Sequence, residues 1–185
     1  TYLAEALQTP AIVLSDQFIG QARTAVERPA EVAFIGQRAK AAEMTTADWI
    51  VRVCADNPFI DGEEVDRLVA FTRREAPDYA FNHLDRLGNG YADGFGAEML
   101  SSAALRVAAT EAVAPEDREH VTTFIWRRPD RFRISTFPAP AELRYPELRF
   151  DVDTPEDLAR LETFAALGID AKASAFVQEA RRRTE

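Results

Sequence analysis

Short apolar runs alternate with stretches of helical periodicity along the first half of this 185-residue chain. The strand-like runs fall at residues 11–14, 32–35 and 49–54, and the helix-like stretches at 17–27, 38–44 and 61–75. This alternation is typical of a parallel sheet covered by helices, because each crossover between parallel strands needs a connecting segment. The pattern therefore predicts an α/β fold, with the strongly apolar run 49–54 near the centre of its sheet.

The second half of the chain continues the pattern with longer helices and a polar loop. Strands are expected at 79–82, 132–137 and 148–152, and helices at 101–113, 115–127, 153–168 and 171–183. Residues 83–97 form a polar loop with four glycines, a length that usually indicates a functional or mobile segment. Without repeats or a linker, the chain is expected to be a single domain.

Composition and charge restrict the function classes. The net charge of −9 argues against broad binding of nucleic acid, whose phosphates the summed field would repel. The apolar runs are far shorter than the roughly 20 residues needed to cross a bilayer, so a membrane span is not expected. The single cysteine, Cys54, has apolar neighbours and is expected to be a buried thiol in the cytoplasm.

Other local patterns carry weaker signals. Arg127, Arg128, Arg131 and Arg133 form a basic cluster, predicted to be a solvated face rather than a phosphate site. No serine lies in a nucleophile-elbow pattern, and no histidine or cysteine pair supports a zinc site.

Asp56 directly follows the predicted central strand, where open parallel sheets bind their ligands. A carboxylate there can hold Mg²⁺ beside substrate phosphates. The alternative is that Asp56 only stabilises the turn through Asn57 and Pro58.

Asp151 and Asp153 are two residues apart in a predicted strand, so their side chains share one face. Asp153 could complete a metal site with Asp56, although sequence alone does not show that the two strands meet. Asp153 is also a suitable N-cap for the following helix, with Glu156 as its capping-box partner. In the glycine-rich loop, Asp93, Gly94 and Glu98 are candidates for substrate recognition, unless the glycines only serve tight turns.

Three segments, in this order, resemble the cytidylyltransferase family, which includes SpsF-like spore-coat polysaccharide proteins and synthetases of CMP-activated acidic sugars. They read IVRVCADNPFID at 50–61, DREHVT at 117–122 and DVDTPEDL at 151–158. The likeness spans about residues 13–167, and includes a strand at 13–16. The resemblance implies a Rossmann-like, mostly parallel sheet with helices on both faces, as in nucleotide-diphospho-sugar transferases.

The resemblance also implies an activity and a set of site residues. The reaction would transfer a cytidylyl group from CTP to an acidic sugar or related acceptor in polysaccharide biosynthesis, with release of pyrophosphate. Asp56 and Asp153 match the family's Mg²⁺-holding positions, and Asp151 is a further candidate metal ligand. The candidate substrate-binding residues are Asn82, Glu98, Arg118, Glu119 and His120. Family members are usually homodimers.

One feature of the family is absent from these 185 residues. Members begin with a strand and a loop of the type Gly-Ser-x-Arg-Leu-Pro-Gly-Lys that holds the triphosphate, and no such loop occurs here. Lys40 and Lys172 both fall in helical stretches and do not replace it. We expect the N-terminal strand and phosphate loop to lie upstream of Thr1. The alternative function is a non-catalytic homologue that acts as a scaffold or binding module.

Overall fold

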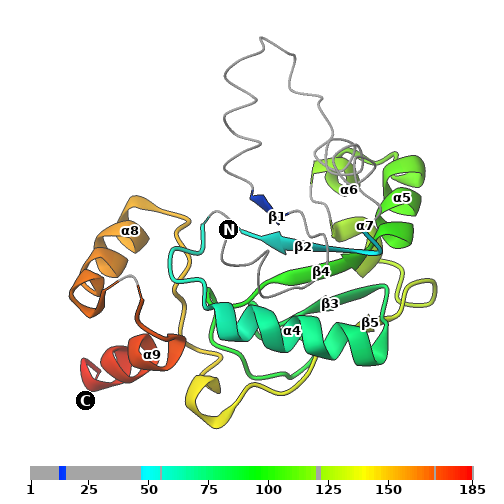
Figure 1. Ribbon diagram of the computed structural model, residues 1–185. Helices are drawn as coiled ribbons and strands as arrows, with labels where there is room; N and C mark the ends of the chain where they lie inside the picture. The colour runs from blue at the N-terminus through cyan, green and yellow to red at the C-terminus, as the bar shows by residue number, and fades with distance from the viewer. Residues whose placement is uncertain (1–12, 16–46, 55, 120–121, 169, 185) are drawn as a thin grey trace.

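The computed structural model describes residues 13–15, 47–54, 56–119, 122–168 and 170–184. Within them, five strands form one sheet in the order β1-β2-β4-β3-β5. The strands are β1 (Val13–Ser15), β2 (Trp49–Val53), β3 (Tyr79–Phe81), β4 (Glu98–Ser101) and β5 (Ile134–Ser135). Figure 1 shows the sheet between α4 and the group formed by α5 and α7.

β2 lies inside this sheet, as its apolar sequence predicted. It runs parallel to β1, with Val13 opposite Val51, and antiparallel to β4, with Ile50 opposite Leu100. β4 was not predicted from the sequence, because a four-residue strand directly before a helix has too few residues to show alternation. Since β4 is antiparallel to both neighbours, whereas β1–β2 and β3–β5 are parallel, the sheet of the described residues is mixed.

Helix α4 (Gly62–Glu75) covers one face of the sheet. Its apolar stripe of Val65, Leu68 and Val69 packs in one cluster with Val51 and Met99. Asp61 is the N-cap, as predicted, but its side chain accepts from the amide of Glu63 rather than forming a capping box with Glu64. The Glu64 side chain instead turns into the interior, where the Tyr91 hydroxyl donates to it at 2.8 Å.

Helix α5 (Ser102–Glu111) covers the opposite face, packing Leu105 and Ala108 with Ile50 and Tyr79. The Ser101 hydroxyl caps its first turn by accepting from the Ala104 amide at 3.0 Å. Of the predicted helix 115–127, the structure describes α6 (Pro115–Glu119) and α7 (Thr123–Trp126), and residues 120–121 lie outside the described residues.

The C-terminal elements form their own core beside the end of the sheet (Figure 1). They are η1 (Ala141–Leu143), α8 (Pro155–Glu162), η2 (Ala165–Leu167) and α9 (Ala173–Arg182). Phe150, Phe164 and Phe176 from three segments pack together there, and Phe59 stacks on Phe176 at 4.1 Å between ring centroids. This core fixes the segment before α8 against the residues that follow β2.

The predicted strand 148–152 is reduced to one parallel bridge between Asp93 and Arg149. The predicted elements at 17–27, 32–35 and 38–44 lie outside the described residues. Among the helices that the structure describes, none combines the length and apolar character needed to span a membrane. Cys54 is partly buried, rather than fully buried as expected.

Candidate active site

Two distant segments meet at the end of β2. The backbone amide of Val152 donates to the carbonyl oxygen of Asp56 at 2.8 Å. Val152 lies between Asp151 and Asp153, so this bond brings the three predicted metal-binding carboxylates to one place. The nearby charges of Asp151 and Asp153 act on the pKa of Asp56, in agreement with this placement.

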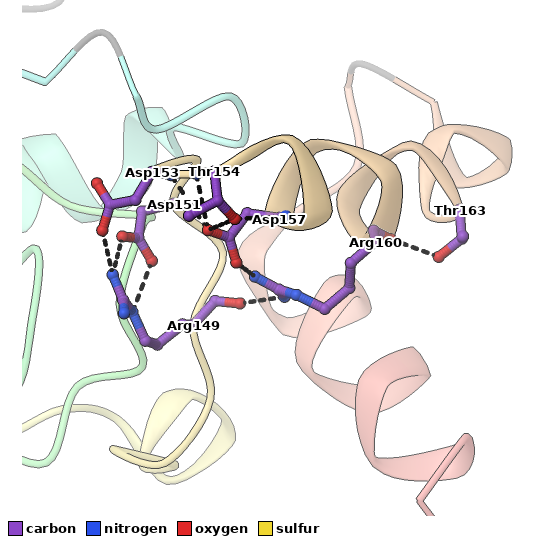
Figure 2. A network of polar contacts seen from close by, with 7 residues as sticks. All are labelled: Arg149, Asp151, Asp153, Thr154, Asp157, Arg160 and Thr163. Atoms are coloured by element: carbon purple, nitrogen blue, oxygen red, sulfur yellow. Dashed lines mark hydrogen bonds and ion pairs between the residues drawn. The ribbon is translucent and has the colours of Figure 1, made fainter.

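Arg149 links two of these carboxylates (Figure 2). Its Nε donates to Asp151 Oδ1 at 3.0 Å, and its Nη2 donates to the second oxygen of the same carboxylate. The same Nη2 donates to Asp153 Oδ2 at 2.8 Å. The two aspartates differ in exposure, because the Asp151 side chain is 10% exposed and that of Asp153 is 59% exposed.

The cap of α8 lies one residue later than the sequence analysis predicted. Thr154, not Asp153, is the N-cap, and Asp157, not Glu156, completes the capping box. The Thr154 hydroxyl accepts from the Asp157 amide at 3.2 Å, while Asp157 Oδ2 accepts from the Thr154 amide at 3.0 Å. Pro155 fits the first helical position, which places the cap at Thr154. The Asp153 carboxylate is therefore not used as a cap.

Asp93 is a fourth carboxylate at this place. Its segment is held by hydrogen bonds from its own amide to Leu148 O and from the Phe150 amide to Asp93 O, each 2.9 Å long. The pKa of Asp93 is raised to about 6. Partial burial is the largest cause, and the negative charge of Asp151 is the second. The opposing charge of Arg149 limits this rise.

The carboxylates at this site repel one another, and Arg52 and Arg149 offset part of this repulsion. Although Asp56 is exposed, partial desolvation raises its pKa, and the charges of Asp151 and Asp153 raise it further. Opposite charge would relieve this repulsion. Mg²⁺ is commonly held by one or two carboxylates plus substrate phosphates and water, and Asp56 and Asp153 are the predicted source of such carboxylates. Within the ranges described, no group of three or more His, Cys, Asp or Glu side chains is arranged to hold a metal ion.

Glu98 belongs to a buried polar network on the α5 side of the sheet. Its carboxylate accepts from Arg52 and from the Tyr79 hydroxyl. Burial alone would raise the pKa of Glu98. Several effects, of which the charge of Arg52 is the largest, instead lower this pKa to about 2. Arg52 also lowers the pKa of Asp56, so this network adjoins the carboxylate group.

Asn82 is fully buried at the end of β3. Its side chain donates to Glu64 O at 2.8 Å and accepts from the Ala97 amide at 3.0 Å. It therefore joins α4, β3 and the segment before β4, while its predicted contact with substrate stays a prediction.

The predicted acceptor segment is only partly described. Arg118 is exposed in α6, Glu119 ends this helix, and His120 lies outside the described residues. Nearby, Arg127 and Arg128 pair with the buried Asp117 at 3.4 and 3.3 Å. Arg131 pairs with Glu111 at 2.5 Å. These internal ion pairs favour a structural role for the basic cluster over phosphate binding.

Arg149 was not among the predicted site residues. The available signal was the spacing of Arg149, Asp151 and Asp153, since alternate residues of an extended segment point to the same side. Arg52 was likewise not predicted as the partner of Glu98. No local pattern could reveal that pair, because it depends on the unpredicted β2–β4 pairing, in which Arg52 lies opposite Glu98.

A separate apolar hollow of about 420 Å³ lies beside the C-terminal core. Its lining includes Phe59, Phe164 and Phe176, and none of the predicted site residues. It is therefore not part of the carboxylate group.

Comparisons with solved structures define the fold class. The chain is similar to a cytidylyltransferase from Leptospira borgpetersenii serovar Hardjo-bovis, with a TM-score of 0.72 and 20% identity, over 99% of this chain and 82% of that one. It is also similar to a CMP:2-keto-3-deoxy-manno-octonic acid synthetase complexed with CTP, with a TM-score of 0.53 and 14% identity, over 89% and 86% of the two chains. The fold is thus the α/β, Rossmann-like fold of nucleotide-diphospho-sugar transferases, as predicted.

Sequence comparisons point to the same group of proteins. No family model matches the chain. The chain is 27% identical over 132 residues to the spore coat polysaccharide biosynthesis protein SpsF of Bacillus subtilis, covering 71% of this chain and 53% of that protein. It is 29% identical over 117 residues to an uncharacterized protein of Methanocaldococcus jannaschii, covering 63% and 46%. The chain thus spans about half the length of the curated relatives it matches.

The similarity to SpsF agrees with the family resemblance of the three ordered sequence segments, and the solved cytidylyltransferase structures share the fold of this chain.

Proposed function

We propose that this chain belongs to a Mg²⁺-dependent cytidylyltransferase that transfers a cytidylyl group from CTP to an acidic sugar or related acceptor and releases pyrophosphate. The observation that carries the proposal is the meeting of Asp56 with the segment of Asp153 through the Val152–Asp56 hydrogen bond. Asp56 and Asp153 lie on segments far apart in sequence, and a cation shared between them would reduce the repulsion between their charges. The similarity to SpsF and to solved cytidylyltransferases supports the choice of reaction.

Each carboxylate has a distinct role in this proposal. Asp56, exposed after β2, and Asp153, exposed before α8, would hold the cation together with phosphate oxygens of CTP. A bound Mg²⁺ would supply charge neutralisation at the phosphates under attack. The remaining task of the protein is to place an acceptor oxygen in line with the α-phosphorus, which is a matter of positioning.

The acceptor and the assembly are further parts of the proposal. Arg118, Glu119 and His120 would line the acceptor pocket, and Arg118 is exposed as such a role requires. A cationic side chain at that pocket suits an acidic sugar, because it would pair with the sugar carboxylate. We further propose a cytoplasmic homodimer, following the resemblance set out above.

The test is pyrophosphate release by the complete protein, incubated with CTP, Mg²⁺ and a panel of acidic sugars. Release is expected with at least one acceptor, to depend on the added Mg²⁺, and to be absent from Asp56→Asn. Calorimetry would show whether CTP binds in the presence of Mg²⁺. Failure of both release and CTP binding would reject the enzyme and favour a non-catalytic scaffold.

A further inference from the structure

Arg149 holds two aspartates by unequal contacts. Asp151 offers both carboxylate oxygens to Arg149, through Nε at 3.0 Å and through Nη2. Asp153 offers one oxygen, to Nη2 at 2.8 Å. Figure 2 shows the guanidinium facing both carboxylates.

The surroundings of the two contacts make their energies unequal as well. The Asp151 side chain is 10% exposed, so removing its partner would leave a nearly buried charge uncompensated. The Asp153 side chain is 59% exposed and that of Arg149 is 56% exposed, so water can replace their contact at little cost. The Arg149–Asp151 pair is thus a fixed anchor, and the Arg149–Asp153 contact is exchangeable.

The main chain around this pair is held independently of the guanidinium. Arg160 Nη1 donates to the carbonyl oxygen of Arg149 at 2.6 Å, and Arg160 Nη2 pairs with Asp157 at 3.2 Å. The capping box of Thr154 and Asp157 fixes the residue after Asp153. The Arg149 side chain can therefore leave Asp153 without any change in the backbone of either residue.

From these observations we propose that Arg149 is a positioning residue that acts as an internal counter-cation, which a divalent cation displaces from Asp153 but not from Asp151. The inference rests on the proposed function, because it assumes a cation at Asp56 and Asp153. It also assigns Asp151 a role different from the predicted one: Asp151 anchors Arg149 and does not bind the metal. Arg149 thereby lowers the affinity of the empty site for the cation.

The test is Mn²⁺ binding to the complete, nucleotide-free protein, measured by electron paramagnetic resonance of the free ion. Mn²⁺ is used because it accepts the same carboxylate ligands as Mg²⁺. Arg149→Met removes both the competing contact and a positive charge a few ångströms from the cation, and should tighten Mn²⁺ binding roughly 5-fold or more. Arg182→Met is the matched control: it removes an exposed arginine of α9 that pairs with Glu179 and lies outside this network, and should change the Kd less than about 2-fold.

A second variant keeps the test decisive if Arg149→Met fails to fold. Arg149→Met/Asp151→Asn removes the arginine together with the buried charge that it neutralises, which preserves the fold. Circular dichroism checks that both proteins are folded. The double variant should also bind Mn²⁺ more tightly than the unaltered protein, whereas loss of binding would make Asp151 a ligand and overturn the inference.

The remaining outcomes separate this inference from the proposed function. If the unaltered protein binds Mn²⁺ and Arg149→Met binds it equally or more weakly, the inference is wrong while the proposed cation site stands. If only the Arg149 variants bind, Arg149 blocks the site and the cation does not displace it, so the displacement is wrong while the cation site stands. If no form binds Mn²⁺, the inference and the cation site both fail.

Discussion

The amide of Val152 and the carbonyl oxygen of Asp56 are joined by a 2.8 Å hydrogen bond that connects the end of β2 to the segment before α8. This bond involves only the backbone, so the side chains on either side of Val152 and at Asp56 do not hold the segments together. The carboxylates can therefore be changed without separating the two segments. The proposed site can therefore be tested by substituting these carboxylates.

Asp56→Asn should lower turnover by about 100-fold or more, because one of the two proposed cation ligands loses its charge. The melting temperature should stay the same or rise, since the pKa of Asp56 is raised and the fold gains nothing from its charge. Pyrophosphate release and thermal unfolding measure the two effects. Asp66→Asn, a matched change at an exposed position of α4, should leave turnover intact. An Asp56→Asn protein with nearly full activity would remove Asp56 from the site.

Glu98→Gln should destabilise the protein by about 3 kcal/mol at pH 7, because Arg52 would lose the charge that compensates it inside the protein. The side chain of Arg52 is only 19% exposed, so water cannot take over this role. Urea unfolding with and without the substitution gives the difference. A loss of turnover without a loss of stability would instead indicate that Glu98 contacts substrate, as its place in the sequence predicted.

The same network predicts a pH dependence. The pKa of Glu98 is lowered from 4.5 to about 2, so its charge stabilises the fold fully above pH 4.5. This contribution is lost as the pH falls from 4.5 towards 2. The stability difference between the unaltered protein and Glu98→Gln should therefore be constant between pH 7 and 5 and become smaller by pH 3.5. An equal difference at pH 7 and 3.5 would show that the ion pair is not the cause.

Much of the fold could be predicted because its elements carry local signals. β2 is a run of apolar and β-branched residues, and α4 has a clear apolar stripe after an Asp61 cap. The end of α7 at Trp126 was not predictable from periodicity. α7 consists of only four residues, two of which, Phe124 and Ile125, are buried by packing with α5 and β3. The structure of this segment depends on tertiary contacts, which sequence periodicity does not reveal.

The candidate site was predictable in part for a similar reason. Asp56 and Asp153 could be found because each follows a strand-like run, where open sheets bind ligands. Their meeting could not be derived, because it depends on a backbone hydrogen bond between distant segments. Arg149 could not be recognised as part of the site because its role depends on its contacts with Asp151 and Asp153 in the folded chain.

Thr154→Ala should cost about 1 kcal/mol, because Thr154 and not Asp153 caps α8. For a chain of this size the melting temperature should fall by about 2–4 °C. Thr154→Ser, which retains the hydroxyl, should melt within about 1 °C of the unaltered protein. Thermal unfolding followed by circular dichroism measures both. If Asp153→Ala in place of Thr154→Ala produced this loss in metal-free buffer, the cap would lie at Asp153 after all.

Gly96→Ala should be among the most damaging single substitutions in the described part of the chain. A Cβ at Gly96 would lie 2.3 Å from the carbonyl oxygen of Asn82 and 2.4 Å from its side-chain oxygen. Neither atom can yield, because the Asn82 amide donates to Ala97 O at 3.1 Å and its side-chain oxygen accepts from the Ala97 amide. The added methyl group must therefore separate β3 from the start of β4, at a cost of about 3 kcal/mol or more.

Gly62→Ala is the matched control for this prediction, since a Cβ at Gly62 has no heavy atom within 4 Å. Gly62 begins α4, where alanine has the higher helix propensity, so this change should leave stability unchanged or raise it by up to about 1 kcal/mol. Urea unfolding of the two variants gives the comparison. Equal stability of Gly96→Ala and Gly62→Ala would mean that the Asn82 hydrogen bonds do not hold the two strands in register. In that case the segment leading to Glu98 would be free to shift relative to β3.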